Sequence, residues 1–271
     1  RRRINVAINL LVNRLQHEEA EAERKHKPFG NNIPIPDYAQ LVGIDAALQR
    51  LEQKIENEEN YQIFSLEGMG GIGKTSLARA FVSQRHIRDK WEDIIWVSAK
   101  QQVLNQNGSI ENTRSSSKTY EEIITQMTSQ LRMVHLADKS ITEKITELIS
   151  ILSEKPYLVV IDNLETIEDY SMLVPEICKW DSKSRFIITT RESLKQYPIV
   201  SCIPINELSE TEAYQLMCNE IQRRGRMAPL TKEEFSPLHD LIGGIPLAIK
   251  LSAGQLQLRS LDGLINDIRQ A

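Results

Sequence analysis

Short apolar runs alternate with longer stretches of helical periodicity through the first three quarters of the chain. The runs that predict strands lie at 62–66, 93–98, 158–162, 185–190 and 199–203. Helical patterns separate most of them. Strands that alternate with helices indicate a mainly parallel sheet covered by helices. The pattern therefore predicts an α/β three-layer sandwich with a five-stranded, mainly parallel sheet.

Capping boxes mark where several of the helices begin. In this motif a Ser or Thr is followed three positions later by Glu, and the two residues satisfy each other's backbone groups. The boxes begin at Thr119, Ser140, Ser209 and Thr231. After residue 208 the strand pattern stops and helical periodicity continues to the end. We therefore expect a domain built on the sheet at 37–207, followed by a small helical domain at 208–271, which we call the lid.

Residues 1–36 differ from the rest in pattern. An amphipathic helix and a charged run are followed by a stretch with three prolines, which predicts an extended linker. No small-residue cleavage site follows the apolar positions, so we do not expect a signal peptide. The chain does not begin with Met, and we expect it to be a piece of a longer protein. The polar stretch 105–118 is predicted to be a long loop.

Composition narrows the function classes. The formal net charge is −4, which gives no electrostatic signal for nucleic acid. No apolar run reaches the roughly 20 residues that span a bilayer, so no membrane partner is expected. The three widely spaced cysteines favour a reducing compartment over a disulfide framework, and we expect a cytoplasmic protein.

One glycine-rich motif carries the strongest chemical signal. Residues 68–75 read G-M-G-G-I-G-K-T, which matches the phosphate-binding loop G-x-x-x-x-G-K-[ST]. A predicted strand precedes the loop and a predicted helix follows it, as this motif requires. Backbone N–H groups and the helix N-terminus would hold phosphate oxygens. The predicted phosphate-binding residues are Gly68, Gly70, Gly71, Ile72, Gly73, Lys74, Thr75 and Ser76.

Two later strands end in residues that suit the same site. The run Y-L-V-V-I-D ends at Asp162, and F-I-I-T-T-R ends at Arg191. Ligands of open parallel sheets bind at the carboxyl ends of the strands, so both side chains are expected near the loop. Thr75 and Asp162 are predicted to hold Mg²⁺, the latter through a water. Arg191 beside the γ-phosphate would distinguish ATP from ADP.

Six motifs in order resemble the NB-ARC proteins of the STAND class of signal-transduction ATPases. They are V-G-I (42–44), the phosphate loop, W-V-S-A (96–99), L-V-V-I-D-N, F-I-I-T-T-R and G-G-I-P-L-A (243–248). The resemblance covers residues 38–271 and suggests a bacterial member. It implies that Val42 and Gly43 contact adenine, that Pro246 closes over the base, and that Arg191 senses the γ-phosphate. A winged-helix domain would follow the lid in such proteins.

The sequence departs from the family pattern at one position that matters for hydrolysis. Many members have a second acid after the first, but here Asn163 follows Asp162, and the next acid is Glu165. Asn cannot act as a general base, so slow hydrolysis is expected, with Glu165 as a candidate substitute.

The resemblance implies an ATP/ADP switch. ADP would hold a resting state, ATP would drive self-association, and weak ATPase activity would reset it. Effector and sensor domains would lie outside this chain. Two alternatives stay open: an AAA-type remodeller or loader, and a nucleotide-controlled transcription regulator.

Overall fold

The computed structural model of the protein describes most of the chain after the predicted linker. The described residues are 33–35, 41–98, 102–104, 110–112, 120–164, 167–180, 182–225 and 230–270. They belong to one compact unit, Asn32–Ala271. The predicted N-terminal helix lies outside the described residues. The division of this unit into a sheet domain and a lid domain stays a prediction.

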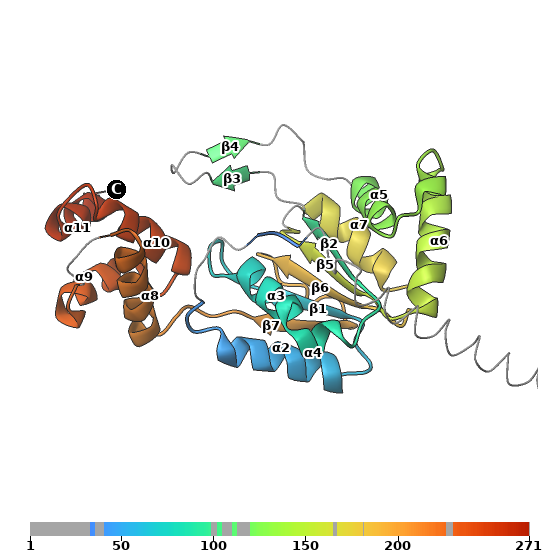
Figure 1. The fold of residues 1–271 in the computed structure, drawn as a ribbon, viewed down its shortest axis with the longest axis horizontal. Coiled ribbons are helices and arrows are strands. Elements are labelled where there is room, and N and C mark those ends of the chain that lie inside the picture. Colours follow the sequence, from blue (N-terminus) through green and yellow to red (C-terminus); the bar gives the residue numbers. More distant parts are fainter. Residues whose placement is uncertain are drawn as a thin grey trace, which may run out of the picture. The chain divides into compact units, whose positions relative to one another are not determined.

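A five-stranded parallel sheet forms the centre of the fold (Figure 1). Its strands are β1 (Ile63–Glu67), β2 (Ile94–Ser98), β5 (Leu158–Asp162), β6 (Arg185–Thr190) and β7 (Val200–Pro204). The order across the sheet is β2-β5-β6-β1-β7, and every neighbouring pair is parallel. The predicted α/β fold with a five-stranded parallel sheet is confirmed. This order places β1, which leads into the phosphate loop, between β6 and β7.

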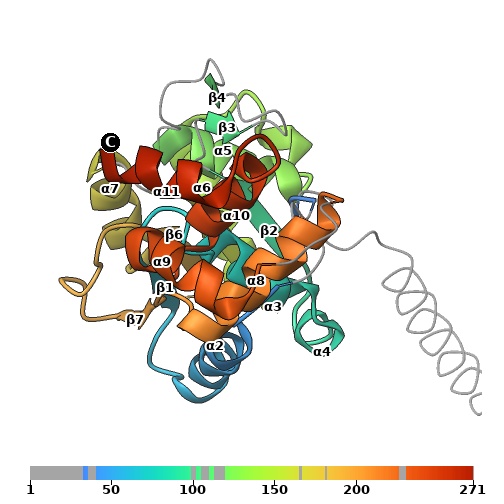
Figure 2. The same cartoon turned by 90° about the vertical axis from the view of Figure 1, so that its left-hand side faces the viewer.

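Helices cover both faces of the sheet (Figures 1 and 2). One face carries α2 (Asp45–Asn57), α3 (Lys74–Ser83) and α4 (Arg85–Arg88). The other carries α5 (Tyr120–Gln130), α6 (Ile141–Glu154) and α7 (Ile167–Ile177), and a 3₁₀ turn, Val134–Leu136, joins α5 to α6. Buried side chains from these three helices and the strands form one apolar core. Burial on both faces explains why the strands are continuous apolar runs.

The lid contains α8 (Glu210–Arg223), α9 (Lys232–Ile242), α10 (Pro246–Gln255) and α11 (Leu261–Gln270). It has its own apolar core, with Met217, Phe235 and Ile249 among its fully or nearly fully buried members. The capping boxes at Ser209 and Thr231 form as predicted, as does the one at Ser140. Thr119 lies outside the described residues.

The predicted loop at 105–118 is partly wrong. Strands β3 (Gln102–Leu104) and β4 (Ile110–Asn112) pair antiparallel, so one of them lies inside that stretch. An Asn-Gly pair at 107–108, a strong hairpin signal, stands between the two strands. The strands were not predicted because each has only three residues, too few to show an alternation of apolar and polar positions. The polar composition of the stretch favoured a loop instead.

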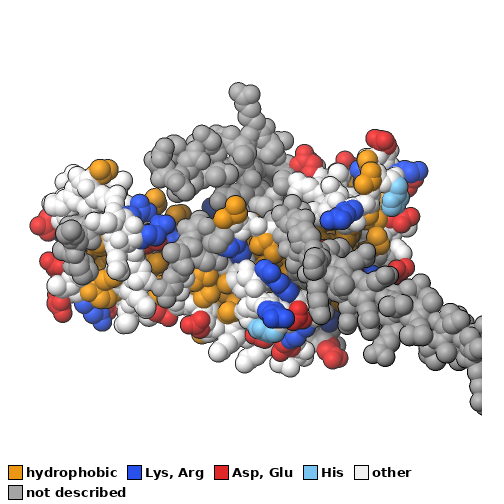
Figure 3. Space-filling view, in the orientation of Figure 1, with side chains coloured by type: hydrophobic (Ala, Val, Ile, Leu, Met, Phe, Trp, Pro, Cys, Tyr) orange, Lys and Arg blue, Asp and Glu red, His pale blue; other side chains and the backbone are white. Residues whose placement is uncertain are grey.

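The distribution of charge, the state of the cysteines and the length of the apolar helices can be compared with the expectations from the sequence. Acidic and basic side chains are interspersed over the described residues on the face drawn in Figure 3. Cys178, Cys202 and Cys218 are all free thiols. No helix within the described ranges is both long and apolar enough to cross a membrane.

Candidate functional site

The phosphate loop joins the end of β1 to the start of α3. Gly71 and Gly73 adopt left-handed backbone conformations, with φ of +78° and +106°. Side chains rarely tolerate this region, which is why glycine is needed where the chain turns so tightly into the helix. Gly73 is the N-cap of α3, so the first turn of the helix presents its unpaired N–H groups at the loop. The loop is therefore a ready-made anion site.

Lys74 is buried within this loop. Its side chain is only 7% exposed, and its Nζ atom donates to the carbonyl oxygens of Gly68 at 2.6 Å and Met69 at 3.0 Å. These two contacts hold the ammonium against the inner backbone of the loop, so its charge lies beside the predicted phosphate position.

The ends of β5 and β6 meet the first turn of α3 through one carboxylate. Thr75 Oγ1 donates to Asp162 Oδ1 at 2.7 Å, and Thr189 Oγ1 donates to the same oxygen at 2.6 Å. Asp162 is 2% exposed. Hydroxyl and carboxylate oxygens are the ligand types that Mg²⁺ prefers, so this donor set fits the predicted metal. Thr189 holds the carboxylate in place, a role that sequence reasoning did not assign.

Asn163 has an unusual backbone conformation. Its φ is +65°, in the left-handed region, which Asn tolerates better than most residues. Its N–H donates to Thr189 Oγ1 at 2.7 Å. The turn after β5 is therefore fixed by the same threonine that holds Asp162. Glu165, the candidate substitute base, lies outside the described residues.

Arg191 lies against the phosphate loop. A Cβ atom placed on Gly70 would be 3.1 Å from the Arg191 Cζ atom. The guanidinium group therefore packs directly on the loop backbone. The structure brings together Arg191, Lys74, Thr75 and Asp162, which come from three separate segments of the chain.

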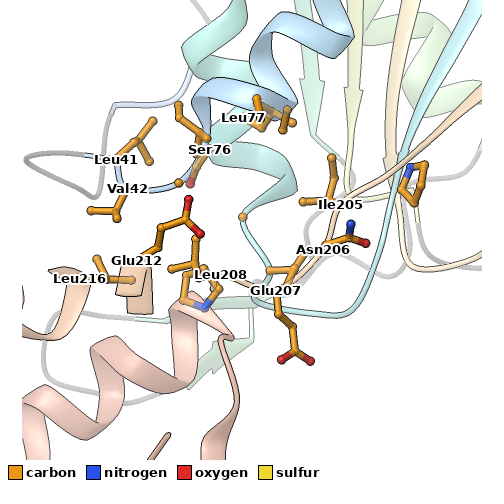
Figure 4. A pocket seen from close by; sticks show the side chains of 18 of the residues that line it. Leu41, Val42, Ser76, Leu77, Ile205, Asn206, Glu207, Leu208, Glu212 and Leu216 are labelled. Carbon is orange, nitrogen blue, oxygen red and sulfur yellow. The ribbon is translucent and has the colours of Figure 1, made fainter. Parts of the chain in front are cut away.

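A cavity of about 240 Å³ opens beside the loop (Figure 4). The residues predicted from the sequence that line it are Val42, Gly43, Ile72, Gly73, Ser76 and Pro246. Sequence reasoning missed a second set of lining residues, which come from the segment between β7 and α8 and from the lid helices. They are Ile205, Asn206, Glu207, Leu208, Glu212, Leu216 and Lys250. A mostly apolar pocket with a few polar groups suits a flat aromatic base.

Gly43 allows two sides of this cavity to approach closely. Its φ is +70°, and a Cβ atom there would be 2.5 Å from Leu208 Cδ2 and 3.0 Å from the Glu212 carboxyl carbon. Val42, next to it, packs against the apolar core of the lid. The V-G-I motif is therefore a contact between the start of the sheet segment and the lid.

Glu212 brings a negative charge to the cavity. Its carboxylate accepts from the Ser209 hydroxyl at 2.6 Å and from the Ser209 N–H at 2.8 Å. The side-chain hydrogen bond from Ser209, followed by the backbone one, lowers the pKa of Glu212 below the ordinary carboxyl value. In Figure 4 this carboxylate points toward Ser76 at the first turn of α3. The ionised capping residue is thus also a polar group of the pocket.

The start of α10 touches the phosphate loop directly. Pro246 is the first residue of the helix, and the next N–H, that of Leu247, donates to the Gly71 carbonyl at 3.2 Å. A Cβ atom on Gly71 would be 2.6 Å from Leu247 Cβ. The lid and the predicted phosphate-binding loop are therefore in backbone contact.

The G-G-I-P-L-A motif is hydrogen-bonded to residues 207–208, which lead from β7 into α8. The Leu208 N–H donates to the Gly244 carbonyl at 2.9 Å, and the Gly244 N–H donates to Glu207 Oε2 at 3.1 Å. A Cβ atom on Gly244 would be 2.0 Å from the Leu208 carbonyl oxygen. No side chain fits there, which explains glycine at this position.

Comparison with known proteins identifies the family of this chain. A family model described as the NB-ARC domain matches residues 44–226. The chain is 30% identical over 135 residues to "Probable disease resistance protein RXW24L" of Arabidopsis thaliana, covering 50% of this chain and 14% of that protein. It is 23% identical over 244 residues to "Probable disease resistance RPP8-like protein 4" of the same plant, covering 87% of this chain and 25% of that protein. The chain thus spans a quarter or less of the length of these relatives.

One solved structure has a similar fold. It is a signal-transduction ATPase with numerous domains and a tetratricopeptide repeat sensor from Pyrococcus horikoshii, with a TM-score of 0.50 at 22% identity, covering 87% of this chain and 33% of that one. The family model covers more than half of the present chain and includes the phosphate loop, Asp162 and Arg191. The chain therefore belongs to the NB-ARC family.

Proposed function

We propose that this chain is the nucleotide switch of a larger cytoplasmic signalling protein. ADP holds the resting state, exchange for ATP moves the lid and promotes self-association, and slow hydrolysis of ATP resets the switch. Effector and sensor domains, in this proposal, belong to parts of the protein outside these 271 residues. This part of the proposal is supported by the relatives, because the chain matches only 14% and 25% of the length of two of them.

The observation that carries the proposal is the contact between α10 and the phosphate loop. The Leu247 N–H donates to the Gly71 carbonyl, and Pro246 lines the same cavity as Gly73 and Ser76. A loop that rearranges around a γ-phosphate would alter this contact at once. Lid position and nucleotide content would then be coupled through a two-state contact, as switches require.

Each predicted residue has a role in this proposal. Lys74 binds the β- and γ-phosphates, and Arg191 senses the γ-phosphate by its charge. The backbone at Val42 and Gly43 binds the adenine edge, and Pro246 closes over the base. Mg²⁺, when bound, would neutralise phosphate charge. Thr75 would ligate it directly and Asp162 through a water, and the hydrogen bonds from Thr75 and Thr189 support the placement of that carboxylate.

Slow hydrolysis follows from the turn after β5. Asn163 occupies the place of a second acid, and its amide cannot accept a proton from water. A slow reset suits a switch, since the ATP state must persist long enough to signal. Glu165 is the candidate substitute base in this proposal.

The nucleotide carried through purification tests the proposal. The purified chain would be denatured, and the supernatant separated by anion-exchange chromatography. We expect close to one ADP per chain. Light scattering should then show a larger mass with a non-hydrolysable ATP analogue than with Mg-ADP. An empty site together with rapid turnover of Mg-ATP would contradict the switch and favour the AAA-type working ATPase.

A further inference from the structure

A carboxylate is buried at the end of β1, directly before the phosphate loop. Glu67 is the last residue of the strand and is 8% exposed, and Gly68 follows it. Burial of a carboxylate is unfavourable unless hydrogen bonds replace its water. The phosphate-binding motif itself does not need an acid at this position, so the residue calls for its own explanation.

Hydrogen-bond donors surround this carboxylate. Oε1 accepts from the Ser65 hydroxyl at 2.7 Å and from the Leu194 N–H at 2.8 Å, and Oε2 accepts from the Ser193 hydroxyl at 3.1 Å. Burial by itself raises the pKa of Glu67, but hydrogen bonds from Cys202, Leu194, Ser65 and Ser193 outweigh it and leave the pKa below the ordinary value. The group is therefore a fixed negative charge.

Two of these donors belong to the turn that carries Arg191. We call residues 191–194 the sensor turn. Ser193 and Leu194 follow Arg191 by two and three positions, and Leu194 is fully buried in the core. At the other end of the turn, the Glu192 N–H donates to Thr190 Oγ1 at 3.0 Å. Both ends of the sensor turn are therefore anchored, one by β6 and the other by Glu67.

The same turn holds its guanidinium on the phosphate loop. Arg191 Cζ lies 3.1 Å from where a Cβ atom of Gly70 would be. Along the chain, Glu67 lies three positions before Gly70. Its carboxylate accepts a hydrogen bond from the N–H of Leu194, which lies three positions after Arg191. The carboxylate thus fixes the distance between the loop and the turn that supplies the arginine.

We propose that Glu67 is a positioning residue that sets Arg191 at the γ-phosphate by tying the sensor turn to the start of the phosphate loop. This inference rests on the proposed role of Arg191 as the γ-phosphate sensor. Glu67 is not among the residues predicted to bind phosphate, which begin at Gly68. Its effect is on the discrimination between ATP and ADP, because only ATP carries the phosphate that Arg191 meets.

Binding of ADP and of a non-hydrolysable ATP analogue, measured by calorimetry with Mg²⁺, tests the inference. The variants are Glu67→Gln, Arg191→Ala and the double variant. Gln keeps the shape but turns an NH₂ group toward donors, which displaces the sensor turn. We expect Glu67→Gln to weaken the ATP analogue roughly tenfold relative to ADP. In the Arg191→Ala background, we expect the same change to have little further effect on that ratio.

A matched control is Glu58→Gln. Glu58 also accepts a serine hydroxyl, that of Ser201 at 2.6 Å, and pairs with Lys54 at 2.7 Å, but it has no contact with the sensor turn among those described. This control should weaken both nucleotides equally or not at all. A second variant, Ser193→Ala, removes one donor on the sensor side and should shift the ratio in the same direction as Glu67→Gln, which keeps the test decisive if Glu67→Gln does not fold.

Each outcome has one meaning. An unchanged ratio in Arg191→Ala would refute the proposed sensor, and this inference with it. A changed ratio in Arg191→Ala, but not in Glu67→Gln or Ser193→Ala, would overturn the inference and leave the sensor standing. Equal losses for both nucleotides, or full additivity in the double variant, would mean that Glu67 only stabilises the fold and would overturn it too.

Discussion

Replacement of Gly244 by alanine tests how the turn before α10 is held against residues 207–208, which lead from β7 into α8. The new Cβ atom would lie 2.0 Å from the Leu208 carbonyl oxygen and 2.8 Å from its nitrogen, both backbone atoms. The two segments must separate, which breaks the Leu208–Gly244 hydrogen bond and the one from the Gly244 N–H to Glu207. One neutral and one charge-assisted bond are together worth about 2–4 kcal/mol of unfolding free energy. In a chain of this size, that corresponds to a fall of roughly 5–15 °C in the thermal midpoint.

The assay is thermal unfolding followed by circular dichroism, with and without Mg-ADP. Gly254→Ala is the matched control: Gly254 lies inside α10, its nearest obstacle is the flexible Arg224 side chain at 3.4 Å, and alanine favours helix. The control should keep or slightly raise the midpoint. Gly244→Ala should also release a fluorescent ADP analogue faster, since Pro246 and Leu247 follow this glycine. If Gly244→Ala melts within about 2 °C of the control, the close contact between Gly244 and Leu208 does not hold these two segments together.

Three further predictions concern the site. Lys74→Ala should abolish nucleotide binding in calorimetry, because the only charge held inside the described part of the loop is lost; unchanged affinity would refute the assignment of the site. Asn163→Asp should raise steady-state turnover of Mg-ATP by about 10²-fold, the lower range for a general base, since Asp also tolerates φ near +65°; an unchanged rate would mean that the missing acid does not limit hydrolysis. Glu67→Gln should lower the free energy of unfolding in urea, and the difference from wild type should be largest above pH 4.5, the ordinary pKa of the carboxyl group. There the ionised Glu67 stabilises the fold, because its pKa is lower in the folded than in the unfolded chain. As pH falls through that lowered pKa, the wild-type advantage should fade, while Cys202 stays a neutral thiol with its pKa raised by burial; a gap that is the same at every pH would contradict this.

The sheet and the phosphate loop could be predicted from the sequence because each strand is a separate apolar run. The strands at 158–162 and 185–190 match the structure residue for residue. The predicted ranges for β1 and β7 begin and end one position before the observed strands. Each observed strand ends on a residue, Glu67 or Pro204, that a search for apolar runs leaves out. The residues brought together at the carboxyl edge were predictable because parallel strands all end there.

Apart from Pro246, the lid residues that line the cavity could not be predicted from the sequence pattern. Leu208 and Gly244 matter through a backbone contact between segments 36 positions apart, which no local pattern records. The role of Glu67 depends on donors from three separate segments: 65, 193–194 and 202. Such contacts follow from the packing of the folded chain and not from the spacing of residue types.

In the proposed switch the lid moves when ADP is exchanged for ATP, and a distance measured between the sheet segment and the lid would detect this movement. Spin labels at Arg85→Cys in α4 and Leu258→Cys in the lid would be placed on exposed side chains, 95% and 81% exposed, after the native cysteines are replaced by serine. Pulsed dipolar spectroscopy would compare Mg-ADP with a non-hydrolysable ATP analogue, and Lys74→Ala would serve as the nucleotide-free control. We expect one distance distribution with ADP and a different mean distance with the ATP analogue. The same distribution in both states would contradict the proposed switch.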